Sequence, residues 1–182
     1  MKKSIATLSL GLLAGLAGNT AFATTGSITF TGKITPETCP IEIIDPINPG
    51  NGDRVAMSDV PAGSFRAPGT EIRSATFAIR VPDKAECGIA EDAAFVRFDG
   101  DNDGHNNFRF NTGANAATGV SLVIKDDTNA AIQPGGESAD YPLNDEGAGA
   151  TDLEFTAHYR STAASVTAGD AIARLQYTVD YR

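Results

Sequence analysis

The feature that most constrains this sequence is the alternating pattern of its last twelve residues. From Ala171 onward, the odd positions read Ala, Ala, Leu, Tyr, Val, Tyr, and the even positions read Ile, Arg, Gln, Thr, Asp, Arg. A period of two residues is typical of a β-strand with one face in a core and the other in water. Chain ends usually fray, whereas this pattern predicts a core strand over 171–181. No later segment of the sequence is available to cover the far edge of that strand.

The first 23 residues have the pattern of a secretory signal peptide rather than of a folded element. Lys2 and Lys3 precede a short apolar run, and Ala21-Phe22-Ala23 is a small-residue cleavage signal. The alternative, a short membrane anchor, is disfavoured because the apolar run is too short to span a bilayer. Removing this leader takes the formal net charge from −9 to −11. Nucleic acid is therefore not an expected partner, because phosphate binding needs clustered Lys and Arg.

Export would place the two cysteines, Cys39 and Cys87, in an oxidising compartment, so we expect one disulfide between them. In the chain-entropy model, closing this loop removes roughly 4 kcal/mol of unfolded-state freedom. The alternative is a pair of free, buried thiols.

Short apolar or alternating runs, separated by glycine, proline and asparagine clusters, predict an all-β sandwich in a single domain. No run longer than a turn or two has helical spacing. The expected strands are 27–34, 38–44, 54–60, 72–81, 93–98, 119–125, 153–160 and 171–181.

The segment that follows the leader is itself a strand pattern. Ile28, Phe30 and Ile34 share one face, with Gly26 in phase, and threonines with Lys33 occupy the other face. The pattern alone fits two interpretations equally well. It predicts either the first strand of the sandwich or a strand that pairs with another molecule.

Several motifs together resemble the major-pilin family of type 1 fimbriae, whose subunits are assembled by the chaperone–usher route. They are the 26–34 segment just before Cys39, the 119–126 segment, the run Phe155-Thr-Ala-His-Tyr159, the run 168–173 and the closing Tyr177-Thr-Val-Asp-Tyr181. The resemblance covers nearly all of the sequence after the leader. It implies an incomplete immunoglobulin-like sandwich that lacks its last (G) strand and is completed by a donor strand from another subunit.

The resemblance also implies roles for individual residues. Residues 24–35 would form the donor extension and 36–182 the pilin domain. The donor side chains would be Gly26, Ile28, Phe30 and Ile34. The acceptor groove and chaperone-recognition residues would be Leu175, Tyr177, Val179, Tyr181 and Arg182.

The implied partners are other pilin subunits in a head-to-tail polymer, a periplasmic chaperone and an outer-membrane usher. The implied location is a fimbria on the bacterial surface that supports adhesion, reached through the periplasm. The sequence departs from the family at its last residue, Arg182, where a neutral polar residue is common.

Sites for catalysis or metals have little support in the sequence. Asp99, Asp101 and Asp103 begin a calcium-loop pattern, but position twelve is Phe110 instead of Glu, so we expect a polar turn. His105 and His158 are the only histidines and lack a ligand cluster. We therefore expect no cofactor, no metal and no enzyme activity.

The alternatives kept open are a minor adaptor pilin and a secreted carbohydrate-binding β-sandwich. A tip adhesin is disfavoured because it would need a receptor domain ahead of Cys39. Tyr141 is expected to pack over the core from a loop rather than to form a ligand platform.

Overall fold

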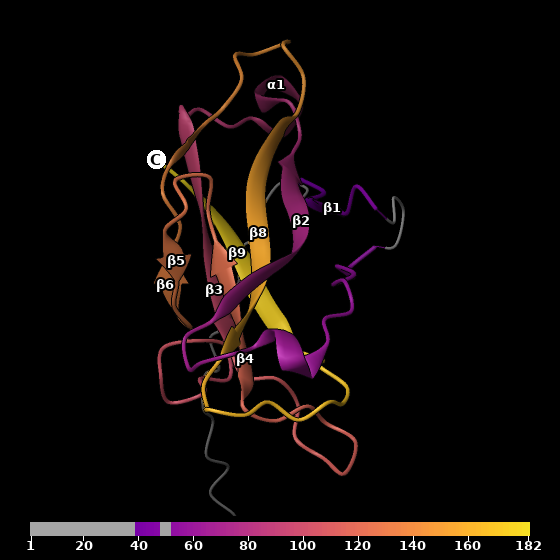
Figure 1. Ribbon diagram of the computed structural model, residues 1–182. Coiled ribbons are helices and arrows are strands. Elements are labelled where there is room, and N and C mark those ends of the chain that lie inside the picture. The colour runs from indigo at the N-terminus through magenta and orange to yellow at the C-terminus, as the bar shows by residue number, and fades with distance from the viewer. Residues whose placement is uncertain (1–38, 48–51) are drawn as a thin grey trace, which may run out of the picture. The chain divides into compact units, whose positions relative to one another are not determined.

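Two antiparallel sheets face each other in this computed structural model, which describes residues 39–47 and 52–182. The first sheet has the order β1-β2-β8-β4-β5. Its strands are β1 (Glu42–Ile44), β2 (Glu71–Val81), β8 (Thr151–Ser161), β4 (Val120–Lys125) and β5 (Ala131–Ile132). Figure 1 shows β2 and β8 side by side along most of their length.

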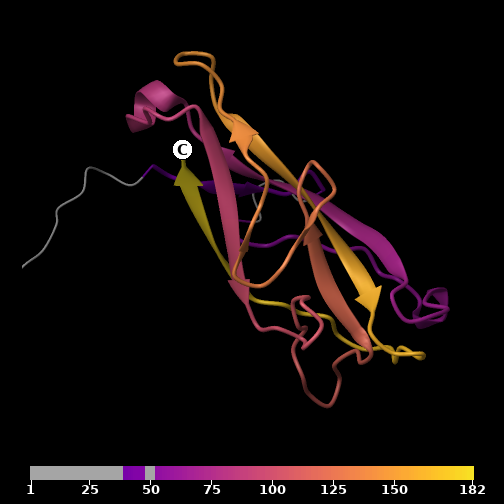
Figure 2. The same cartoon turned by 90° about the vertical axis from the view of Figure 1, so that its left-hand side faces the viewer.

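The second sheet is built around β3 (Ala93–Gly100). One edge of β3 pairs with β6 (Gly136–Glu137) and β7 (Tyr141–Pro142), and the other pairs with β9 (Leu175–Tyr181). In Figure 2, β3 and β9 form one layer, and β2, β4 and β8 form the other. The expected all-β sandwich is therefore confirmed.

Alternation along the central strands places one face of each sheet in a shared core. Phe77 of β2, Phe98 of β3 and Phe155 of β8 meet there, with ring centroids 5.2–6.4 Å apart. Leu153 and Val96 are fully buried beside them. Each such side chain contributes about 1.5–3 kcal/mol through burial, so this cluster holds the two sheets together.

Within residues 39–47 and 52–182, helical structure is limited to two short pieces, the 3₁₀ turn η1 (Ala62–Ser64) and the one-turn helix α1 (Lys84–Cys87). Over the residues that the structure describes, no helix is long and apolar enough to cross a membrane.

The predicted strand over 54–60 is wrong. Its backbone is tethered at isolated points: Ser58 N–H donates to Ser74 O at 3.1 Å, and Ala56 N–H donates to the Asp45 carboxylate at 2.9 Å. The Ala56 N–H is thus bonded to a side chain rather than to a neighbouring strand, and the Ser58 bond goes to Ser74, where the β2–β8 ladder has a bulge between Arg73 and Ala75.

Two other predicted strands are shorter than expected. The 38–44 run begins as a strand only at Glu42, and the 171–181 run begins only at Leu175. Leu175 pairs with Gly100, the last residue of β3, so the residues before Leu175 have no β3 residue opposite them. Their backbone groups form hydrogen bonds with a loop instead. Ile172 O accepts from Asn111 N–H at 2.7 Å, and Ile172 N–H donates to the Asn111 side chain at 3.1 Å.

Tyr141 packs over the core, as expected, but it does so from the short strand β7 rather than from a loop. Its ring is 5% exposed and packs against Phe155, while its hydroxyl donates to the Glu154 carbonyl at 2.6 Å. Burial raises the pKa of this hydroxyl well above its usual range, although the hydrogen bond from Asp127 N–H acts in the opposite direction. The phenol therefore stays protonated and serves as a fixed donor at physiological pH.

Candidate functional site

The last strand, β9, has β3 as its only strand partner among the described residues. The pairing is regular from Gly100↔Leu175 to Ala94↔Tyr181. It continues into the last residue, because Arg182 N–H donates to Ala93 O at 2.9 Å and Ala93 N–H donates to Arg182 O at 3.0 Å. One edge of β9 is thus fully used, and the other carries backbone groups without a neighbouring strand in the part of the chain described.

The inward side chains of β9 are only partly buried. Leu175, Tyr177, Val179 and Tyr181 all pack against the core, yet none reaches the burial of the core itself. By contrast, Val96 of β3, which pairs with Val179, is 0% exposed. Burial also raises the pKa of the Tyr181 hydroxyl, with a smaller contribution from Glu91. The core therefore extends under β9 but is not covered there.

An open groove of about 930 Å³ lies beside the first half of β9. Its floor includes the core side chains Phe77, Phe98 and Leu122, and Leu175 and Tyr177 form one wall. The groove is far larger than the roughly 30 Å³ that one water occupies in the liquid. It has room for several side chains of an extended segment.

Sequence reasoning placed Leu175 and Tyr177 at this groove, and both line it. Val179 and Tyr181 lie farther along β9, on the same face but beyond the lining residues. The residues that sequence reasoning missed come from distant parts of the chain: Ile43, Val55, Met57, Phe110, Tyr159 and the 166–174 loop. The alternation of Val55 and Met57 indicates a buried face, but by itself it predicts a strand of the sandwich rather than the lining of a groove.

Two loops close the groove end near the start of β9. Ala117 N–H donates to Asp170 O at 3.0 Å, and Asp170 N–H donates to Asn115 O at 2.7 Å. Gly169 precedes Asp170 in the second loop, and a Cβ at this position would lie 2.5 Å from backbone atoms of Asn115 and Ala116 in the first loop. A residue without a side chain is therefore required for the loops to approach this closely.

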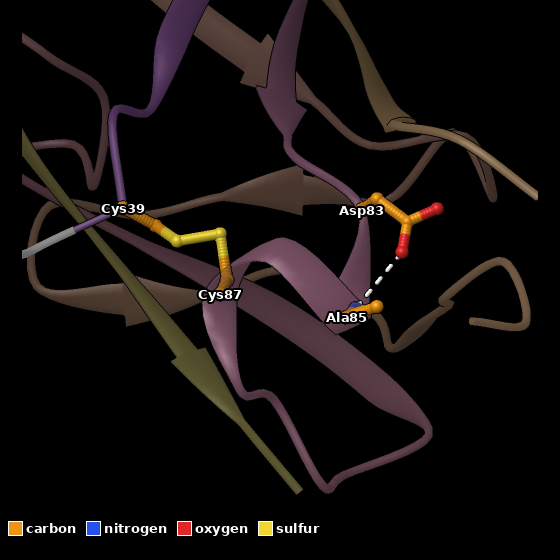
Figure 3. Close-up of a disulfide and its surroundings, with 4 residues drawn as sticks. All are labelled: Cys39, Asp83, Ala85 and Cys87. Atoms are coloured by element: carbon orange, nitrogen blue, oxygen red, sulfur yellow. Dashed lines mark hydrogen bonds between the residues drawn. A yellow bond between two sulfur atoms is a disulfide. The ribbon is translucent and has the colours of Figure 1, made fainter. Parts of the chain in front are cut away.

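The expected disulfide joins Cys39 to Cys87, with the two Cα atoms 5.6 Å apart (Figure 3). Beside it, Asp83 caps α1 by accepting a hydrogen bond from Ala85 N–H at 2.8 Å. The same carboxylate also accepts from the N–H groups of Gly147 and Gly149 at 3.0 and 2.7 Å. These three bonds lower the pKa of Asp83, and the bond from Gly147 contributes most to that change.

The Asp-rich segment is a folded turn, as expected. The Asp103 carboxylate accepts from Asn107 and Ser121 side chains at 2.9 and 2.6 Å. Burial acts to raise the pKa of Asp103, but these bonds outweigh it, so the pKa is lowered. Within the described residues no three His, Cys, Asp or Glu side chains are grouped as metal ligands.

His158 lies on the outer face of the first sheet, where its ring nitrogen is 2.9 Å from the Thr156 hydroxyl. Partial burial, together with the nearby Lys125, lowers its pKa. The proposed donor side chains Gly26, Ile28, Phe30 and Ile34, like the 1–23 leader, lie outside the described residues.

Comparison with known proteins gives consistent matches over nearly the whole chain. The model of a family described as fimbrial protein matches residues 28–182. Long polar fimbria protein A of Salmonella typhimurium is 29% identical over all of this chain and 97% of its own length. The type-1 fimbrial protein subunit of Serratia marcescens is 30% identical over the full length of both chains.

A solved subunit of a chaperone–usher pilus superposes with a TM-score of 0.58 and 20% identity, over 87% of this chain and 96% of that one. At this identity the likeness concerns the fold alone, and it confirms the expected immunoglobulin-like sandwich.

Proposed function

The chain belongs to the fimbrial protein family, and from that premise we propose that it polymerises by donor-strand exchange. It is a structural subunit of a fimbria, as its relatives are, and not an enzyme. In the proposed polymer, residues 24–35 of one copy enter the groove beside β9 of the next. The mode is β-augmentation, in which backbone bonds supply affinity and side-chain pockets set the register.

The observation that carries this proposal is the state of β9. The strand pairs on one edge with β3, its four inward side chains remain half-buried, and two of them, Leu175 and Tyr177, line an open groove. An added strand would pair with the free edge and bury these side chains in the same step. An edge left open in this way promotes aggregation, so the arrangement favours a strand that arrives from outside.

The proposed donor segment has the chemistry that the groove needs. Ile28, Phe30 and Ile34 would point into it, and Gly26 would fit where space is small. Burying three large apolar side chains contributes roughly 5–9 kcal/mol. Ordering the donor backbone costs about 1–2 kcal/mol per residue. Slow release of the paired strand, rather than net affinity alone, would then give the fibre its durability.

Before a donor arrives, the groove would need a temporary cover. We propose that a periplasmic chaperone provides it and recognises the end of β9 at Tyr181 and Arg182. An outer-membrane usher would then direct exchange to the next subunit. Export behind the 1–23 leader would bring the chain to the periplasm, and the finished fimbria would lie on the bacterial surface and support adhesion.

A pair of donor variants tests this proposal. Phe30→Asp places a charge on the face that would be buried, whereas Thr29→Asp places the same charge on the opposite face of the strand. We expect Phe30→Asp to abolish fibres, seen by electron microscopy and by sedimentation of surface extracts, and Thr29→Asp to retain them. Normal fibres from Phe30→Asp would contradict the proposed donor face.

A further inference from the structure

The outer face of the second sheet carries a chain of charged side chains that begins and ends on the last strand. Arg182 Nε donates to the Asp140 carboxylate at 2.7 Å, and its guanidinium lies 3.8 Å from Glu137. Glu137 accepts from Arg97 at 2.6 Å, and Arg97 lies 3.9 Å from Asp180. Positive and negative groups therefore alternate across the sheet: Arg182 beside β9, Glu137 on β6, Arg97 on β3 and Asp180 on β9.

The same arginine covers an apolar ring. Its guanidinium carbon lies 4.0 Å from the centre of the Phe95 ring. Phe95 alternates with the inward residues Ala94 and Val96, and it is outside the core cluster, yet only 8% of it is exposed. A planar guanidinium is suited to stacking on an aromatic face while it donates to a carboxylate. Arg182 thus straps β9 across the outer face of β3.

We propose that this strap, formed by Arg182, Asp140, Glu137, Arg97 and Asp180, is a positioning device that holds β9 in its strand position while the groove is empty. The inference rests on the proposed donor-strand function. The inner face of β9 is only half-buried, so core packing holds this edge strand less firmly than it holds the central strands β2, β3 and β8. Its outer face supplies ion pairs and a ring contact that do not depend on what fills the groove.

The strap would therefore keep the free edge and the groove wall preformed, so that an incoming donor meets an ordered template. Preorganisation of this kind lowers the ordering cost of binding. Once a donor is paired with the other edge of β9, the strand is held from both sides. The contribution of the strap should then be much smaller.

The first sheet offers a matched control. Arg80 makes a bidentate pair with Asp152, with both bonds at 2.7 Å and with side-chain exposures of 41% and 38%. Those residues lie on β2 and β8, which each have two neighbouring strands along the sheet. Breaking this pair removes a similar surface interaction, but β2 and β8 are held in place by a neighbouring strand on each side.

The test compares Arg182→Gln and Asp140→Asn with Arg80→Gln in the mature full chain, folded at low concentration as a monomer. Two quantities are measured: amide hydrogen exchange over residues 175–182, and the rate of capture of a labelled synthetic peptide of residues 24–35. We expect both strap variants to raise exchange about three- to tenfold, the scale of a few exposed ion pairs, and to slow capture by a similar factor. Arg80→Gln should match the wild type, and Arg182→Lys should be intermediate.

High salt is a second, mutation-free test. Because the pairs are exposed, about 1 M NaCl should raise exchange in the wild-type β9 toward that of Arg182→Gln. Exchange in both strap variants equal to that in the wild type and in Arg80→Gln would overturn the inference. A wild-type monomer that captures no peptide would instead contradict the donor proposal, while the exchange comparison would still decide the role of the strap.

Discussion

Gly169→Ala is the substitution for which the structure gives the sharpest expected cost. Its Cβ would lie 2.5 Å from the Ala116 carbonyl carbon and the Asn115 oxygen, and 2.6 Å from Ala117 N. Every one of these is a backbone atom, so no side-chain rotation can relieve the contact. The 113–118 and 162–170 loops would have to separate by several tenths of an ångström.

The separation would weaken the bonds that join the loops, which include Asp170 N–H to Asn115 O at 2.7 Å and Ala117 N–H to Asp170 O at 3.0 Å. Each such bond contributes about 0.5–1.5 kcal/mol, and steric overpacking costs typically 1–3 kcal/mol. We therefore expect Gly169→Ala to lower the free energy of unfolding by about 2–4 kcal/mol.

Urea unfolding, followed by near-ultraviolet circular dichroism, measures this change in the mature chain with residues 24–35 moved behind Arg182 through a flexible linker, which we expect to fold as a monomer. Gly113→Ala is the matched control, because it lies in the same loop pair, with open space around its Cβ position. We expect the control to stay within about 0.5 kcal/mol of the wild type, as surface substitutions usually do. A Gly169→Ala protein as stable as Gly113→Ala would refute the argument from close backbone approach.

Three further predictions follow from the core, a buried carboxylate and the disulfide. Phe155→Ala, at the centre of the aromatic cluster, should cost about 3–5 kcal/mol in urea unfolding, and a cost below about 1 kcal/mol would mean that the cluster does not hold the sheets. Asp126 is 5% exposed, and although burial acts to raise its pKa, hydrogen bonds from Thr128, Ala130 and Ala139 lower that pKa below its ordinary value. Its contribution to stability should be fully present well above the ordinary aspartate pKa of about 3.9 and should be lost as the pH falls through the lowered pKa. Asp126→Asn should flatten that part of a stability–pH curve, and curves of the same slope for both proteins would contradict this. Replacing Cys39 and Cys87 together by serine should lower the free energy of unfolding by about 2–5 kcal/mol, whereas an unchanged midpoint would show that the bridge is dispensable.

The central strands could be predicted from the sequence because their alternation coincides with a one-sided core. The 72–81, 93–98 and 153–160 runs all fall within β2, β3 and β8. Alternation alone could not establish pairing, and for this reason the 54–60 prediction was wrong. Val55 and Met57 do alternate, but the segment makes isolated hydrogen bonds to Asp45 and Ser74 instead of a ladder.

The candidate site was predictable only along β9. The terminal alternation predicts the inward face of Leu175 and Tyr177, and the family resemblance implies their place at a groove. Ile43 and Met57 also line the groove, and only the three-dimensional fold brings them near. The strap could not be predicted either, because it joins Arg182 to Asp140 across 42 positions of sequence. Sequence patterns report the face of a strand, but not which distant loop lies over that face.

The direct test of the account is whether a donor strand completes the fold. The mature chain without residues 24–35 is compared with the same chain carrying these residues through a flexible linker after Arg182, by sedimentation velocity and thermal unfolding. We predict that the truncated chain aggregates or needs a chaperone, whereas the relinked chain is a monomer that unfolds cooperatively at higher temperature. A truncated chain that is itself a stable, cooperatively unfolding monomer would contradict the claim that the groove beside β9 awaits a strand.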